Sequence, residues 1–163
     1  MTSELLPREF YAGPAVDVAR RLLGCVLEYK GLGGRILEVE AYLGEGDEAA
    51  HSFRGITPRT RVIFGEPGHA YVYLNYGIHY CLNVVTEPEG RAGCVLIRSV
   101  EGLGNGPGKL TRAMGITKKL NGCDLTRGPL TIRRGRPPLQ IAVTPRIGIR
   151  KAADLPLRFL ASD

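Results

Sequence analysis

The sequence contains no tryptophan, and it lacks the marks of a membrane protein, a secreted protein or a metal site. No apolar run approaches the roughly 20 residues of a membrane-spanning helix, and the N-terminus lacks the basic and then apolar order of a signal peptide. Neither a C-x-x-C pair nor histidines at zinc-ligand spacing occur. These absences predict a protein that is not secreted and that binds no metal. The widely spaced cysteines are expected to be free thiols in a reducing compartment; they are Cys25, Cys81, Cys94 and Cys123.

Positive charge is concentrated in the second half of the chain. The formal net charge is +6, and over residues 109–151 the lysines and arginines are opposed by Asp124 alone. Residues 38–48 are acidic instead. A basic half beside an acidic segment is typical of a protein that holds a polyanion while chemistry takes place at a carboxylate. A solvated basic face that only confers solubility is the alternative.

The stretch GRILEVEAYLG at residues 34–44 has the pattern of a strand with one polar face. A period of two divides it into a core face with Leu37, Val39, Ala41 and Leu43, and a second face with Ile36, Glu38, Glu40 and Tyr42. Successive carboxylates on the second face lie about 6.6 Å apart along the strand. An unpaired buried carboxylate is costly to desolvate, so this face is predicted to meet solvent or to form a site.

The remaining elements follow from turn and capping residues. Pro14 and Gly24 bracket a predicted helix at 15–23. The glycines of 31–34 are predicted to turn a strand at 25–30 into the Glu40 strand, and 75–77 to turn a hairpin over 70–83. Residues 57–61 resemble a helix start. Further predictions are a strand at 93–100, a helix at 107–114, and short strands at 130–133 and 139–144, followed by a closing segment at 157–160.

Three further residues are singled out by their settings. Arg98 is the one charge in the apolar strand 93–100, so it requires an anion. Tyr76 falls at the hairpin tip, where a large ring cannot bury itself against its own hairpin. Tyr71 and Tyr80, by contrast, are expected in a cross-strand core cluster, and Cys81 and Cys94 are also expected in the core.

GRILEVEAYLG and the DEAAHS that ends at residue 52 resemble the alkyladenine (3-methyladenine) DNA glycosylase family. The likeness continues through TPRTRVIFGEPGHAYVYLNYGIHYCLN and GCVLIR to NGPGKL and PRIGI, so it covers nearly the whole chain. It implies an α+β fold in which residues 1–163 form a single compact domain. A largely antiparallel, curved β-sheet is expected to be flanked by short helices, with one hairpin inserted into DNA.

The resemblance also implies roles for individual residues. Glu40 matches the general base and Arg98 its partner, and the main-chain carbonyl of Ile147 matches a ligand of the attacking water. The residues that match the base pocket are Tyr42, His51 and Tyr73 for stacking, and Asn83 for discrimination against the 2-amino group of guanine. Tyr76 matches the wedge that fills the gap left by a flipped nucleotide. Phosphate contacts are expected from Arg59, Arg61 and Lys109.

These residues imply a monofunctional glycosylase that excises alkylated or deaminated purines, of the 3-methyladenine, 7-methylguanine, hypoxanthine and ethenoadenine types. It would act on damaged double-stranded DNA as a monomer, without membrane, cofactor, metal or lyase activity. The location would be cytoplasmic in a bacterium and nuclear in a eukaryote. Where vertebrate members carry methionine and tyrosine, this sequence has Ile78 and His79. These two differences bear on how tightly DNA is held and on which damaged bases are excised.

Two other functions are compatible with parts of the sequence. Glu38 and Glu40 could be the carboxylate pair of a sugar glycosidase, because their expected separation overlaps the roughly 6.5–9.5 Å of inverting enzymes. The basic second half and the absence of tryptophan weigh against this. A non-catalytic nucleic-acid-binding module would explain the charge and the tyrosines, but not Glu40 and Arg98.

Overall fold

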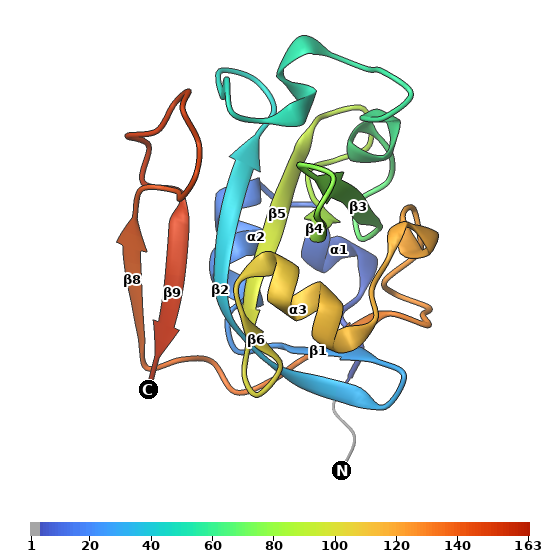
Figure 1. Cartoon of the computed structure of the whole chain (residues 1–163), viewed down its shortest axis with the longest axis vertical. Coiled ribbons are helices and arrows are strands. Elements are labelled where there is room, and N and C mark those ends of the chain that lie inside the picture. Colours follow the sequence, from blue (N-terminus) through green and yellow to red (C-terminus); the bar gives the residue numbers. More distant parts are fainter. Residues whose placement is uncertain (1–3) are drawn as a thin grey trace.

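The computed structural model describes residues 4–163, and over this range it is built on one curled antiparallel sheet (Figure 1). The strands are β1 (Val26–Tyr29), β2 (Leu32–Leu43), β3 (Ala70–Asn75), β4 (His79–Val85), β5 (Gly93–Val100), β6 (Gly104–Asn105), β7 (Thr131–Arg133), β8 (Gln140–Thr144) and β9 (Arg158–Ser162). Their order is β3-β4-β5-β2-β1-β7, while β6 pairs with β5, and β9 pairs with both β2 and β8. The predicted α+β class and the curved, largely antiparallel sheet are confirmed.

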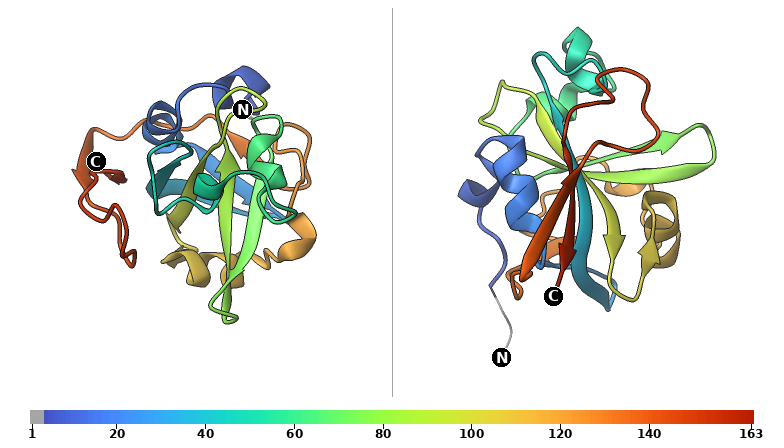
Figure 2. Two further views of the ribbon diagram at one scale, coloured as in Figure 1. Left: turned by 90° about the horizontal axis from the view of Figure 1, so that it is seen from above. Right: turned by 90° about the vertical axis from the view of Figure 1, so that its left-hand side faces the viewer.

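Short helices cover the sheet on two sides. They are α1 (Arg8–Tyr11), α2 (Ala15–Leu22) and α3 (Pro107–Met114), with 3-10 helices at His51–Arg54, Arg61–Phe64 and Lys118–Leu120. The views in Figures 1 and 2 place α2 and α3 on opposite sides of β2 and β5. Between residues 4 and 163, no helix has the length and apolar character needed to cross a membrane.

The predicted helix at 15–23 is confirmed as α2, which ends one residue earlier. Gly24 follows it with a φ of +91°, and a Cβ there would lie 2.3 Å from the carbonyl oxygen of Arg136. Glycine is therefore required on two counts, conformation and space. The helix at 107–114 is confirmed as α3, and the 57–61 segment leads into a 3-10 helix, not an α-helix.

The long strand β2 is irregular near its middle, and this overturns the predicted placement of Ile36. Ile36 pairs with Val100 and Glu38 with Ser99, so Leu37 is an extra residue in this part of the ladder. A bulge of this kind shifts the alternation of side chains. Ile36 is therefore fully buried in the main core, whereas the sequence pattern had placed it on the face of the carboxylates.

The turn between β1 and β2 is also tighter than predicted. It is formed by Lys30 and Gly31, with φ values of 50° and 80°, and Gly33 and Gly34 already pair with β1. Two consecutive residues with positive φ give a turn whose twist matches that of the flanking strands. The predicted four-residue turn at 31–34 was therefore wrong in position.

The hairpin of β3 and β4 projects from the body of the molecule (Figure 2). Its turn comprises residues 76–78, one residue later than the predicted 75–77, and both Tyr76 and Gly77 have positive φ. Tyr76 is 81% exposed and Ile78 71% exposed at this tip. At the base of the tip, a Cβ on Gly108 would lie 2.6 Å from the ring of His79, so the imidazole packs directly on the start of α3. Nothing in the fold tests the expected insertion into DNA.

The C-terminal strand β9 completes the core through Phe159, which is 1% exposed. We predict that Phe159→Ala lowers the free energy of unfolding by about 3–5 kcal/mol, because it leaves a large cavity in a packed core. Leu139→Ala is the matched control, since Leu139 is 82% exposed and its truncation is expected to change stability by about 0.5 kcal/mol or less. Urea denaturation measures both. Equal values for the two variants would contradict this placement of β9.

Candidate active site

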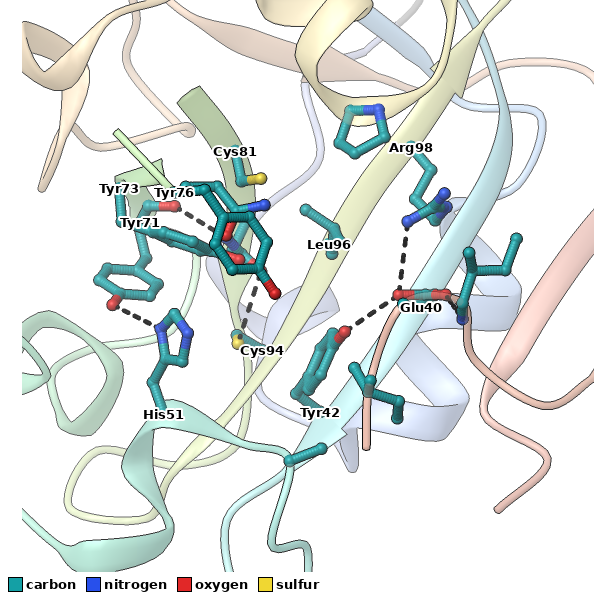
Figure 3. A pocket seen from close by; sticks show the side chains of 17 residues that line it. Glu40, Tyr42, His51, Tyr71, Tyr73, Tyr76, Cys81, Cys94, Leu96 and Arg98 are labelled. Atoms are coloured by element: carbon teal, nitrogen blue, oxygen red, sulfur yellow. Dashed lines mark hydrogen bonds and ion pairs between the residues drawn. The ribbon is translucent and has the colours of Figure 1, made fainter. Parts of the chain in front are cut away.

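A pocket opens beside β2 and β5, below the tip of the β3–β4 hairpin (Figure 3). It contains eight of the residues that the sequence singled out, which are Glu40, Tyr42, His51, Tyr73, Tyr76, Asn83, Arg98 and Ile147. They come from β2, the 44–58 loop, the hairpin, β5 and the loop after β8. The pocket therefore unites segments that lie as far as 107 residues apart.

Glu40 lies in the wall of this pocket and is fully buried. The hydroxyl of Tyr42 donates to its Oε1 at 3.0 Å, and the main-chain N–H of Ile147 donates to its Oε2 at 2.7 Å. The guanidinium of Arg98 lies 3.7 Å from Oε1. These donors replace part of the hydration that a carboxylate loses when it is buried.

The closest partner of Arg98 is Glu38, which corrects the prediction that named Glu40 alone. Arg98 Nε donates to Glu38 Oε2 at 2.8 Å, and Arg158 Nε donates to the same oxygen at 2.6 Å. Ser99 Oγ donates to the other oxygen at 3.1 Å. Burial raises the pKa of Glu38, but the hydrogen bonds and charges of Arg158 and Arg98 outweigh it and hold the pKa below its usual value. Glu38 thus fixes Arg98 beside Glu40.

Aromatic rings form the sides of the pocket. Figure 3 shows Tyr42 next to Glu40, and His51, Tyr71 and Tyr73 across the opening from it. The ring centroids of His51 and Tyr73 lie 4.5 Å apart, and the planes of the two rings make an angle of 68°. The hydroxyl of Tyr71 lies 3.0 Å from Nδ1 of His51. The space between the two sides has the character of a slot for a flat, aromatic group.

The sequence assigned Tyr71 to the core and missed this contact. Tyr71 is indeed buried, but it also lines the pocket and holds the His51 ring. The signal was present, because the alternation of β3 places Tyr71 and Tyr73 on one face. Cys81 and Cys94 are buried as expected, yet both also line the pocket. All four cysteines are free thiols in the structure.

Asn83 contributes a buried amide to the floor of the pocket. Its Nδ2 donates to the main-chain carbonyl of Tyr71 at 3.3 Å, and the thiol of Cys94 lies 3.8 Å from its Oδ1. These contacts orient a side chain whose two ends differ in hydrogen-bonding character. The amide of Asn83 is therefore held in one orientation in the lining of the pocket.

The predicted phosphate contacts lie outside the pocket. Arg59 stacks on Tyr73, with its Cζ 5.2 Å from the ring centroid, so it supports a pocket wall. Arg61 and Lys109 are exposed. Within residues 4–163, no group of histidine, cysteine, aspartate or glutamate side chains is arranged to hold a metal ion.

Desolvation of the ring sets the protonation state of His51, although the residue as a whole is exposed. The surrounding rings desolvate the imidazole and Arg59 adds a positive charge, which together lower its pKa to about 4. Burial likewise raises the pKa values of Tyr42 and Tyr73. At neutral pH the aromatic sides of the pocket are thus uncharged.

Comparison with known proteins places this chain in a family. Residues 9–163 match the family model described as methylpurine-DNA glycosylase. The chain belongs to this family. It is 51% identical to a protein of Methanoculleus marisnigri, with 94% of this chain and 93% of the relative covered, and 49% identical to one of Carboxydothermus hydrogenoformans, with 95% and 94% covered. A Rhodopseudomonas palustris protein is 48% identical, with 98% and 85% covered. All three relatives are named "Putative 3-methyladenine DNA glycosylase".

The neutral state of His51 in this methylpurine-DNA glycosylase family member can be tested by NMR. We predict that its ring resonances titrate with a midpoint near 4, well below the usual 6.5. Arg59→Gln should raise the midpoint, because it removes a nearby positive charge. The midpoint should remain below 6.5, since burial is the larger cause. A parent midpoint close to 6.5 would show that the ring is hydrated and that the slot is more open than described.

Proposed function

We propose that the chain is a monofunctional DNA glycosylase that excises alkylated or deaminated purines, of the 3-methyladenine, 7-methylguanine, hypoxanthine and ethenoadenine types. The family and the names of the relatives support the class of reaction. The observation that carries the proposal is Glu40, a fully buried carboxylate beside a slot between aromatic rings. Residues 1–163 would act as one such domain, which initiates base excision repair.

A purine stacked in duplex DNA cannot reach this slot, so the nucleotide must first be rotated out of the helix at a cost of a few kcal/mol. Stacking on Tyr42 on one side, and on His51 and Tyr73 on the other, would offset this cost by roughly 1–3 kcal/mol. Methylation at N3 or N7 makes a purine cationic. A neutral His51 adds no charge repulsion, and the faces of the tyrosine rings attract a cation.

The hydrolysis requires a water below C1′ of the flipped nucleotide. Glu40 would accept a proton from this water while its oxygen bonds to C1′ and the N-glycosidic bond breaks, with the electron pair leaving on the base. The carboxylate would also stabilise positive charge on the sugar. Arg98 would bind the same water, together with the main-chain carbonyl of Ile147. The N–H of Ile147 already holds Glu40 in place.

DNA binding would depend on the face that surrounds the pocket. The exposed ring of Tyr76 is suited to fill the gap in the duplex, and the neighbouring Ile78 can pack in the minor groove. Arg61, Lys109 and Arg59 would contact phosphates near the flipped nucleotide. The protein would act as a monomer.

The sugar glycosidase alternative is disfavoured by the surroundings of Glu38. Both of its oxygens accept hydrogen bonds, from Arg98 and Arg158 on one side and from Ser99 on the other. It also does not line the pocket of Glu40. No lysine is found among the described residues that line this pocket, which favours hydrolysis by water over Schiff-base chemistry. A non-catalytic DNA-binding module remains the alternative that activity assays must exclude.

Glu40→Gln tests the proposed base. The substrate is a duplex oligonucleotide with one ethenoadenine or hypoxanthine, incubated with chelator and then treated with hot alkali. We predict that the variant loses excision by at least about a hundredfold, because the amide cannot accept the proton, while it still binds the duplex. Glu48→Gln is the matched control, since it removes the same charge from an exposed position. Equal activity of Glu40→Gln and the parent would move the base elsewhere, and strand breaks before alkali would indicate a lyase.

Tyr76→Ala tests the hairpin tip. We predict that excision from duplex DNA, measured at subsaturating enzyme, falls about ten- to a hundredfold, because nothing then fills the gap left by the flipped nucleotide. Excision of the same lesion from single-stranded DNA should change little, since no gap is created there. A similar loss with both substrates would instead assign Tyr76 to the pocket wall.

A further inference from the structure

A buried ion pair lies behind the pocket, between two residues that are 99 positions apart. Arg146 binds Asp47 through two hydrogen bonds of 2.7 Å and 2.8 Å, and both side chains are completely inaccessible to solvent. Asp47 also accepts the main-chain N–H groups of Leu43 and Ala49, at 2.9 Å and 3.1 Å. The carboxylate therefore ties the end of β2 to the loop that leads to His51.

The same guanidinium supports the Tyr42 side of the pocket. Its Cζ lies 4.7 Å from the centroid of the Tyr42 ring, and its Nη1 donates to the carbonyl of Ala41 at 3.0 Å. Arg146 is not among the residues that line the pocket. It therefore covers the face of the Tyr42 ring that points away from the opening, and leaves the other face free.

Arg146 is also the anchor of the loop that reaches Glu40. Within residues 141–156, all of which are described, it is the one residue that is buried. The next residue, Ile147, has an exposed side chain, but its N–H donates to Glu40 Oε2 at 2.7 Å. The position of this N–H is therefore set largely by the side chain of Arg146, whose Nη2 also holds the loop through the carbonyl of Ala152.

We propose that the Asp47–Arg146 pair is a positioning element of the active site. It holds the Ile147 amide against Glu40 and the Tyr42 ring against the slot, so that the Glu40 carboxylate keeps one orientation beside the pocket. This inference rests on the proposed glycosylase function for its kinetic consequence. Its geometric part, the placement of the Ile147 N–H, can be measured independently.

Loss of the pair should slow excision. Without the Ile147 N–H, the Glu40 carboxylate loses a charge-assisted hydrogen bond of 2.7 Å that fixes its orientation. Without Arg146, the Tyr42 ring also loses the guanidinium that lies 4.7 Å from its centroid. The ion pairs that hold Arg98 beside Glu40 are made by Glu38 and are independent of the Asp47–Arg146 pair. A slower but measurable rate is therefore expected.

The test uses Asp47→Leu/Arg146→Met, because replacing both partners leaves no unpaired charge in the interior and is often tolerated. We expect the single-turnover rate of ethenoadenine excision at neutral pH to fall about tenfold. The matched control is Arg8→Met/Asp124→Leu, which removes an ion pair of 2.7 Å whose residues do not line the pocket. Its rate should equal that of the parent. Circular dichroism and thermal melting establish that each variant is folded.

NMR separates this inference from the proposed function. The amide proton of Ile147 should resonate downfield in the parent, because it is bonded to a carboxylate, and should move upfield in the double variant. If the double variant does not fold, Arg146→Lys retains the charge but not the two-point contact, and it should shift the resonance and lower the rate in the same directions by less. An unchanged resonance or an unchanged rate in a folded variant would overturn the proposal. A parent without excision activity would overturn the proposed function, while the resonance would still decide the positioning role.

Discussion

The structure depends on supplying hydrogen-bond donors to a carboxylate that is buried beside the pocket. Glu40 is fully buried, and an isolated ion in such a place would be protonated or would destabilise the fold. Its donors come from three separate segments, through Tyr42 on β2, Arg98 on β5 and Ile147 in the loop after β8. Each segment must be correctly placed before the charge is compensated. The site is therefore coupled to the packing of the whole sheet.

The second buried carboxylate, Glu38, makes this arrangement possible. It lies two residues before Glu40 on β2, and it binds one arginine from each neighbouring strand, Arg98 on β5 and Arg158 on β9. Without Glu38, those two guanidinium groups would repel each other across β2. With it, Arg98 is held by its Nε and presents another nitrogen to Glu40. The ion pairs of Glu38 with Arg98 and Arg158 thus fix the position of Arg98 beside Glu40, the candidate general base.

Local features of the fold were predictable, because local residues determine them. Pro14 and Gly24 delimit α2, and Tyr76 with Gly77 forms the turn of the projecting hairpin. The bulge at Leu37 was not predictable from alternation, since it arises from how β2 pairs with β5. It buries Ile36 and leaves Leu37 partly exposed, and a second register shift follows between Glu38 and Val39.

In the candidate site, too, some features were predictable from the sequence and others were not. A resemblance over nearly the whole chain brought together Glu40, His51 and Tyr73, which individually carry weak signals. The contacts between distant segments were missed, because nothing in the sequence near Asp47 indicates that Arg146 will bind it. The link between Tyr71 and His51 was missed for a related reason. A tyrosine on an apolar strand is usually a core residue, and only the fold shows that its hydroxyl reaches the pocket.

Arg146 and Arg59, which contact the rings of Tyr42 and Tyr73, affect how strongly the slot would attract a cationic base. Arg146 lies behind Tyr42 and Arg59 against Tyr73, so each ring already interacts with one cation of the protein. The charge of Arg146 is balanced by Asp47, and that of Arg59 is screened because the side chain is exposed. Neither therefore strongly repels a cationic purine on the pocket face. Under the proposed function, selection of a base would therefore depend less on its charge than on its fit between the rings and on the polar groups of the lining, among them Asn83.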